Sequence, residues 1–210
     1  MNKYITEFVG VFFLVLVTGL ALGSGSELAP IAIGATLMVM AYMGKDISGA
    51  HFNPAVTLAW YVRSRISLRE GAIYVGVQFL AGLVASLIAG LLVQNPEFVF
   101  QIRPSSESLV VQSLLVEILF TFALVLVTLH VQDAEAPANG YYGLAVGAAY
   151  MALIFAGQPI SGAAFNPALG VGPDLINGGF SYVWIYLIGP LAGGALAGFV
   201  YLVQMPKEDA

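Results

Sequence analysis

The chain has 210 residues, of which 59% are hydrophobic and only 9% are charged, with 7 Lys and Arg against 12 Asp and Glu. Soluble domains carry about 25% charged residues. The composition therefore excludes a soluble globular protein, a disordered chain and a nucleic-acid-binding protein. There is no cysteine, which excludes disulfides and thiolate metal sites. We therefore expect an integral membrane protein surrounded by membrane lipids.

Six apolar stretches are long enough, or nearly so, to cross a bilayer as helices, which takes about 20 residues. They are residues 4–22, 28–43, 71–93, 109–131, 141–157 and 182–204. The second and the fifth are short. An even number of spans places both termini on the same side of the membrane.

The basic residues predict which side that is. Six of the seven fall on the side of the termini, namely Lys3, Lys45, Arg63, Arg65, Arg69 and Lys207, whereas Arg103 alone falls on the other side. Because cytoplasmic loops are enriched in Lys and Arg, we expect a multi-pass protein of the cell membrane with both termini in the cytoplasm.

Two further apolar segments do not fit a spanning helix. Residues 47–62 and 160–176 are each interrupted by an Asn-Pro pair. Irregular backbone at membrane depth is tolerated only where it is buried in protein or lines a water-filled cavity. These segments are therefore expected to be re-entrant half-helices.

The same two segments reveal an internal repeat. The sequence SGAHFNPA at residues 48–55 returns as SGAAFNPA at residues 161–168, with seven of eight positions identical. Glu7 and Glu117 occupy matching places in the first span of each half. Because each half holds three spans, the two halves cross the membrane in opposite orientations. Inverted repeats of this kind are typical of transport proteins.

Each Asn-Pro-Ala motif predicts the start of a helix. Asn is a preferred N-cap and Pro is favoured at the first helical position. In an inverted repeat the two helix starts meet near the bilayer centre, and each brings a partial positive charge. The Asn amides can then donate to water or an alcohol, while cations are repelled and a proton-conducting water chain is interrupted. The residues are Asn53, Pro54, Ala55, Asn166, Pro167 and Ala168.

At these motifs the sequence resembles the aquaporin, or major intrinsic protein, family. The likeness covers nearly the whole chain and includes the glutamate in the first helix of each half and the Gly189-Pro190 and Gly193-Gly194 pairs of the last span. It implies six transmembrane helices with two half-helices, assembled as a homotetramer with one pore in each subunit.

In that family a ring of four side chains, typically Phe, His, Cys or Thr, and Arg, forms the narrowest point on the outer side of the paired motifs. The resemblance places Ile33, Ile154, Ala163 and Leu169 at these positions. All four are apolar, and the arginine is replaced by Leu169. We expect a wide filter that admits small neutral solutes, while the competing outcome is an apolar lining that dewets and slows water.

Three other residues are candidates for the site. Glu7 and Glu117 are carboxylates inside membrane helices, which are functional by default. The resemblance implies that they accept hydrogen bonds from the re-entrant loops, and a proton-coupling role is the alternative. His51 precedes the first motif and is expected in the pore vestibule.

The fold expected is an all-α membrane protein with six transmembrane helices, two re-entrant half-helices and an inverted repeat. One channel domain covers residues 1–210, with repeats at about 1–105 and 106–210. The function expected is passive passage of water, glycerol, urea, ammonia or metalloid hydroxides, with ions and protons excluded at the Asn-Pro-Ala pair. We expect no enzyme, no cofactor and no metal site, because the chain lacks a nucleophile constellation and a ligand cluster.

Two alternatives remain. The first is an ion- or proton-coupled secondary transporter that uses Glu7 and Glu117. The second is a junctional or scaffold protein that has lost permeability, which the short termini disfavour.

Overall fold

The computed structural model describes residues 1–93, 95, 97–133, 138–178 and 180–205. Over these residues the chain forms eight α-helices and no strand. The helices are α1 (Asn2–Gly23), α2 (Ala29–Ser48), α3 (Pro54–Val62), α4 (Leu68–Leu92), α5 (Val110–Gln132), α6 (Tyr142–Ser161), α7 (Pro167–Asn177) and α8 (Val183–Gln204). All of these except α3 and α7 are long and apolar enough to cross a membrane. The six predicted spans are therefore confirmed.

The two spans predicted to be short are longer than expected. Both α2 and α6 have 20 residues, because each continues to a left-handed glycine cap, Gly49 or Gly162. The polar residues near the end of α2 suggest an earlier stop, but the Lys45 ammonium lies 4.1 Å from the centroid of the Tyr142 ring, which accommodates its charge within the helix. In α6, Pro159 is tolerated because it sits in the last turn.

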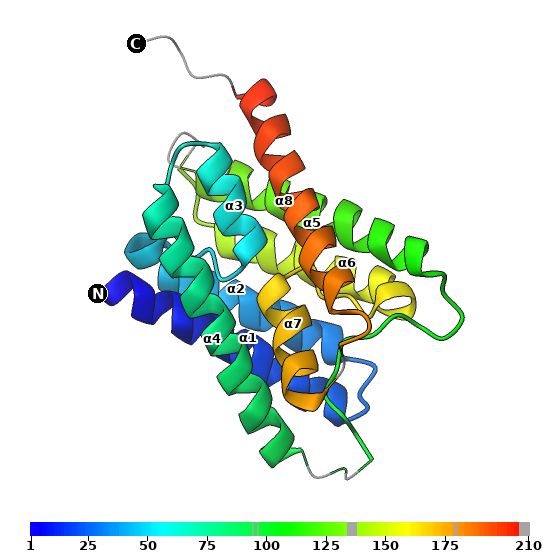
Figure 1. Ribbon diagram of the computed structural model, residues 1–210. Coiled ribbons are helices and arrows are strands. Elements are labelled where there is room, and N and C mark those ends of the chain that lie inside the picture. The colour runs from blue at the N-terminus through cyan, green and yellow to red at the C-terminus, as the bar shows by residue number, and fades with distance from the viewer. Residues whose placement is uncertain (94, 96, 134–137, 179, 206–210) are drawn as a thin grey trace, which may run out of the picture.

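The half-helices begin at the two motifs. The Asn53 side chain caps α3 and the Asn166 side chain caps α7, and a proline occupies the first position of each helix. Figure 1 shows α3 and α7 one after the other along the molecule, between α4 and α8, and both half-helices contact both of these spans. The prediction of two short helices that start at the Asn-Pro pairs is confirmed.

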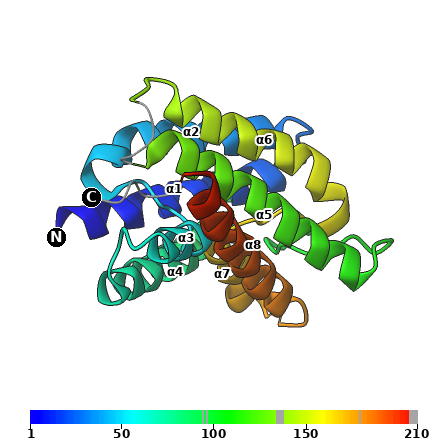
Figure 2. The same ribbon diagram turned by 90° about the horizontal axis from the view of Figure 1, so that it is seen from above.

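The helix contacts repeat in the two halves. The contact of α1 with α4 matches that of α5 with α8, and the contact of α1 with α2 matches that of α5 with α6. Helices α2 and α6 pack against each other, on the side away from α4 and α8 in the view of Figure 2. These matching contacts relate the halves by an approximate two-fold axis, as expected for an inverted repeat.

Glycines allow the half-helices to approach the spans closely. A Cβ atom added to Gly82 of α4 would lie 2.5 Å from the carbonyl oxygen of Ala168, and one added to Gly194 of α8 would collide with the carbonyl oxygen of Ala55. Gly193 faces the backbone of α5. The small residues of α8 thus serve packing within one subunit. Gly194 of α8 brings the first Asn-Pro-Ala motif against its span, and Gly82 of α4 does the same for the second.

Basic side chains lie at the end of the molecule where α1 and α4 begin. Lys3 at the start of α1 pairs with Glu70 at the start of α4. The Arg63 guanidinium lies 4.5 Å from the centroid of the Tyr201 ring near the end of α8. The start of α1 and the end of α8 therefore share one end of the molecule. Lys207 lies outside the described residues.

Candidate functional site

The two Asn side chains link the halves of the molecule at the meeting point of α3 and α7. The Asn53 Oδ1 atom accepts a hydrogen bond from the Ala55 backbone N–H (2.8 Å), and its Nδ2 donates to the Phe165 carbonyl oxygen (2.8 Å). Asn166 repeats this pattern with Ala168 (3.0 Å) and the Phe52 carbonyl oxygen (2.9 Å). Each amide carries two N–H groups, so one donor of each Asn is held in place while the other is available to a permeant molecule.

A small cavity lies beside this pair. Its volume is about 10 Å³, close to the minimum that holds one water molecule. Both Asn residues line it, together with His51 and the apolar side chains of Leu14, Leu37, Val56, Leu124 and Val146. A water molecule in this cavity would meet few polar partners besides the Asn donors.

The two buried glutamates hold the re-entrant loops. In the first half, Glu7 accepts hydrogen bonds from the Ser48 hydroxyl (2.7 Å), the His51 N–H (3.0 Å), the Phe52 N–H (2.7 Å) and the Gln78 amide (2.8 Å). The fully buried carboxylate thus compensates backbone donors that would otherwise lack partners at membrane depth.

Glu117 does the same in the second half. It accepts from the Ser161 hydroxyl (2.7 Å) and from the N–H groups of Ala164 (3.0 Å) and Phe165 (2.7 Å). It is also fully buried. These contacts are those that the resemblance implies for a glutamate that supports a loop.

The loops themselves adopt the same unusual backbone conformation. Four non-glycine residues have positive φ angles, namely Ala50 (50°), Phe52 (48°), Ala163 (61°) and Phe165 (47°). Such conformations cost about 1–3 kcal/mol each and persist only where the surroundings enforce them. The glutamates and the Asn cross-links provide that enforcement, which fixes the direction of the loop carbonyls.

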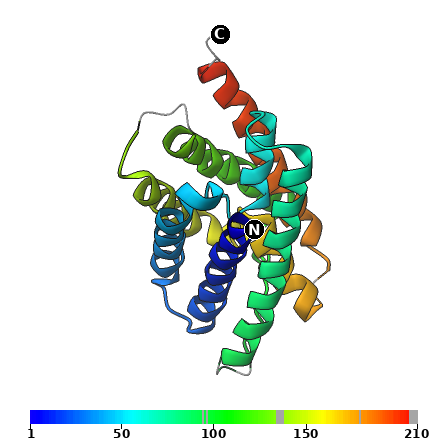
Figure 3. The ribbon, with the colours of Figure 1, turned by 90° about the vertical axis from the view of Figure 1, so that its left-hand side faces the viewer.

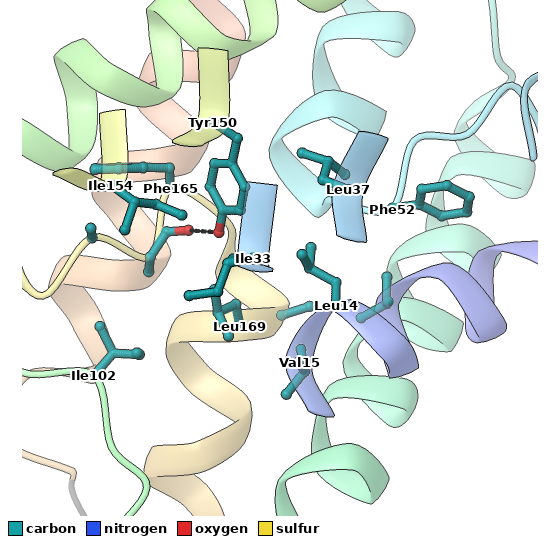
Figure 4. Close-up of a cluster of buried hydrophobic side chains, with 14 of the residues drawn as sticks. Leu14, Val15, Ile33, Leu37, Phe52, Ile102, Tyr150, Ile154, Phe165 and Leu169 are labelled. Atoms are coloured by element: carbon teal, nitrogen blue, oxygen red, sulfur yellow. Dashed lines mark hydrogen bonds between the residues drawn. The ribbon is translucent and has the colours of Figure 1, made fainter. Parts of the chain in front are cut away.

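The structure brings the four ring residues together. Ile33 comes from α2, Ile154 from α6, Ala163 from the second loop and Leu169 from the first turn of α7. All four belong to one hydrophobic cluster, part of which is drawn in Figure 4, and their side chains are only 1–4% exposed. The four residues are thus buried in one cluster, and the wide filter that the sequence predicts stays a prediction.

Two residues of this region were missed by the sequence analysis. Tyr150, one helical turn before Ile154, lines the cavity and donates its hydroxyl to the Ala164 carbonyl oxygen (2.9 Å), as Figure 4 shows. Ile102 belongs to a loop but is only 2% exposed and packs in the ring cluster. No periodicity marks a buried loop residue, although the alternation of apolar residues at 98, 100 and 102 is a weak signal.

His51 lies deeper than the predicted vestibule. It is only 4% exposed, and it lines the same cavity as the Asn pair. Its Nδ1 lies 3.1 Å from the Thr57 hydroxyl, and its ring packs against Trp60 and Tyr74. It is therefore a fixed part of the wall beside the Asn pair. No group of three or more metal-ligating side chains is present in the described part of the chain.

Comparison with known proteins decides the family. The family model described as Major intrinsic protein matches residues 1–201. This chain belongs to that family. The chain is 36% identical to an aquaporin NIP1-1 of Zea mays, over 96% of this chain and 74% of the relative. It is 35% identical to a putative aquaporin NIP4-1 of Arabidopsis thaliana, over 95% of this chain and 73% of the relative.

Two further relatives agree. A probable aquaporin TIP2-2 of Arabidopsis thaliana is 35% identical, over 96% of this chain and 86% of the relative. The fold matches the X-ray structure of the aquaglyceroporin from Plasmodium falciparum with a TM-score of 0.83 at 20% identity, covering 95% of this chain and 94% of that one.

Membership in the major intrinsic protein family makes the chain a multi-pass membrane channel for passive passage of water and small solutes, and not an enzyme. A coupled transporter is not favoured, because Glu7 and Glu117 accept hydrogen bonds from the loops.

Proposed function

We propose that this channel passes water and small uncharged solutes through an outer ring that has no hydrogen-bonding side chain. The candidate solutes are glycerol, urea, ammonia and undissociated metalloid hydroxides. The observation that carries the proposal is the set Ile33, Ile154, Ala163 and Leu169, which is apolar at every position and buried in one hydrophobic cluster. A ring without the arginine fork offers no donors that select one solute over another.

The Asn pair is the proposed barrier to ions and protons. The N-termini of α3 and α7 meet there, and each carries a partial positive charge. The remaining donors of Asn53 and Asn166 orient a single water molecule in the small cavity, so the hydrogen-bonded water chain that a proton needs is interrupted. Cations meet two helix N-termini and no compensating carboxylate, because Glu7 and Glu117 face the loop backbones.

The close packing of the ring makes side-chain rotation part of the proposed permeation path. Ile and Leu side chains exchange rotamers without breaking hydrogen bonds, so opening costs packing contacts only.

The assembly and the location are proposed on the same basis. A single channel domain covers residues 1–210, with repeats at about 1–105 and 106–210, and four copies form a homotetramer with one pore in each. The chain lies in the cell membrane with both termini in the cytoplasm, surrounded by membrane lipids. The grouping of Lys3, Arg63 and Arg65 at one end of the molecule supports this orientation.

Stopped-flow light scattering on proteoliposomes tests the proposal. The full chain is reconstituted, and vesicle volume is followed in gradients of sucrose, glycerol, urea and ammonia. We expect water and at least one of the three neutral solutes to cross faster than through protein-free vesicles, with rates that rise linearly with the gradient. No increase for any of them would contradict the channel function.

The same vesicles separate the channel from the coupled transporter. An imposed proton or sodium gradient should leave the solute rates unchanged. Saturable flux that follows the ion gradient, and that is lost in Glu7→Gln and Glu117→Gln while both variants remain folded, would support the transporter instead.

A further inference from the structure

An apolar groove runs along the outer face of the molecule between α3, α4 and α8. Its volume is about 310 Å³. The walls are apolar and include Leu58 and Tyr61 of α3, Gly71 and Val75 of α4, and Leu191 of α8. It lies where α3 is seen between α4 and α8 in Figure 1.

A second pocket adjoins the groove at the end of the molecule that carries both termini, and we name it the polar pocket after the polar side chains that share its lining with apolar ones. Its volume is about 680 Å³, and its lining includes Ser64, Arg65 and Ser67 of the loop between α3 and α4, with Phe199 of α8 on the other side. Figure 3 shows this loop beside the upper part of α8. Tyr61 lines both the groove and the pocket, so the two spaces are adjacent.

The polar pocket has the chemistry of a phosphate site. The Arg65 side chain is 29% exposed, and its guanidinium lies 3.4 Å from the buried Asp133 carboxylate, which anchors it from the protein side. The Ser67 hydroxyl accepts a hydrogen bond from the Glu70 N–H and can still donate its own proton outward. Arginine and hydroxyl donors are the groups that bind phosphate oxygens in proteins.

The two spaces together match one kind of ligand. The groove is apolar and lies on the outer face of the spans. The pocket contains Arg65 and Ser67 beside the 59% exposed Phe199, and it lies at the end of the spans, where lipid headgroups are found. We propose that this composite site binds an anionic phospholipid of the leaflet at the terminal end, with its phosphate at Arg65 and one acyl chain in the groove.

The site also abuts the pore wall. Thr57 lines the groove, and its hydroxyl lies 3.1 Å from His51 Nδ1 and 3.0 Å from the Gln78 amide nitrogen. His51 in turn lines the cavity of the Asn pair. Two side chains, Thr57 and His51, therefore separate a bound acyl chain from the pore cavity, and neither is changed in the test.

Two pairs of variants in the full chain test the proposal. Gly71→Leu fills the groove, because a Cβ atom at Gly71 would lie 3.7 Å from Thr57 Cγ2 and 3.8 Å from Ile66 Cγ2, which are ordinary contacts. Gly76→Leu is its control on the same helix, since a Cβ atom there would meet no atom within 4 Å. Arg65→Gln removes the phosphate partner, and Arg69→Gln removes an equal charge that does not line the pocket.

Native mass spectrometry of the purified chain measures retained lipid after titration with phosphatidylglycerol or phosphatidylcholine. We expect the unmodified chain to bind phosphatidylglycerol about tenfold more tightly, which corresponds to about 1.4 kcal/mol. Gly71→Leu should weaken phosphatidylglycerol binding about tenfold, and Arg65→Gln should remove the preference for it, whereas both controls should behave like the unmodified chain. Thermal unfolding in detergent verifies that each variant is folded.

Three results would overturn the proposal. Equal loss in Arg65→Gln and Arg69→Gln would indicate general attraction to the charged surface. Unchanged binding in Gly71→Leu would show that no acyl chain enters the groove. This measurement remains informative even if Arg65→Gln does not fold. Displacement of phosphatidylglycerol by millimolar inorganic phosphate would indicate a site for free phosphate instead of a lipid.

Discussion

Leu169 lies in the first turn of α7, and its side chain is 1% exposed. The proposed outer ring includes this residue at the position where the family resemblance implies an arginine. Leu169→Arg adds five donors and a positive charge to the ring. We expect glycerol and urea rates to fall about tenfold relative to the water rate, equivalent to about 1.4 kcal/mol of added barrier, in the stopped-flow assay.

Leu169→Met is the matched control, because it keeps a flexible apolar side chain of similar volume. It should preserve the order of solute rates. An unchanged order in Leu169→Arg as well would show that residue 169 does not set selectivity.

Asp174 lies near the end of α7, outside the six spans, and is fully buried. Burial raises its pKa from 3.8 to about 7, although the Arg103 charge and the Ile102 N–H act in the opposite direction. A carboxyl with a raised pKa binds its proton more strongly in the folded state, so stability falls as pH rises from about 4 to about 7. We expect the unfolding temperature in detergent to decrease over that range.

Asp174→Asn tests this dependence because the amide does not titrate. The variant should lose most of the decrease between pH 5 and pH 8 and should be the more stable protein at pH 8. Asp46→Asn, at an exposed carboxyl of α2, is the control and should follow the unmodified chain. If all three proteins gave the same pH profile, burial of Asp174 would not govern it.

At the scale of elements, the position of each half-helix depends on close backbone contact with a span. Gly82→Ala places a methyl group 2.5 Å from the Ala168 carbonyl oxygen, which displaces α7 and the second motif. Overpacking of this kind costs about 1–3 kcal/mol. We expect a lower unfolding temperature and a reduced water rate.

The control for that substitution is Gly76→Ala on the same helix. A Cβ atom at Gly76 would meet no atom within 4 Å, so only the gain in helix propensity remains, about 1 kcal/mol. Gly76→Ala should be neutral or stabilising. Equal destabilisation by both variants would show that α4 needs glycine for a reason other than its contact with α7.

The ends of the elements show where sequence reasoning stops. The starts of α3 and α7 follow from Asn and Pro chemistry, which is local. The length of α2 does not, because Lys45 is accommodated by Tyr142, a residue almost a hundred positions away. The packing of Ile102 against the ring is likewise a tertiary effect, and no local pattern predicts it.

At the scale of the whole molecule, the repeat predicts the architecture, but the two halves are not identical. The hydroxyls of Tyr74 and Tyr186 donate to the carbonyls of Ser48 and Ser161, so α4 and α8 occupy equivalent places. Gln78 supplies Glu7 with an additional hydrogen bond, whereas the residue at the corresponding place of α8 is Pro190, which has no side-chain donor. Glu7 therefore accepts one more hydrogen bond than Glu117, whereas the second loop gains one from the Tyr150 hydroxyl.

The orientation of the molecule is open to a direct test, because the chain contains no cysteine and single cysteines can be introduced on a clean background. The two substitutions are Glu107→Cys, in the loop before α5 on the side of Arg103, and Asp46→Cys, near the end of α2. Both positions are exposed. With cytoplasmic termini, a membrane-impermeant maleimide should label intact cells at residue 107 and should label residue 46 only after the cells are permeabilised. The reverse pattern would place the termini outside, and it would contradict the orientation inferred from the distribution of Lys and Arg.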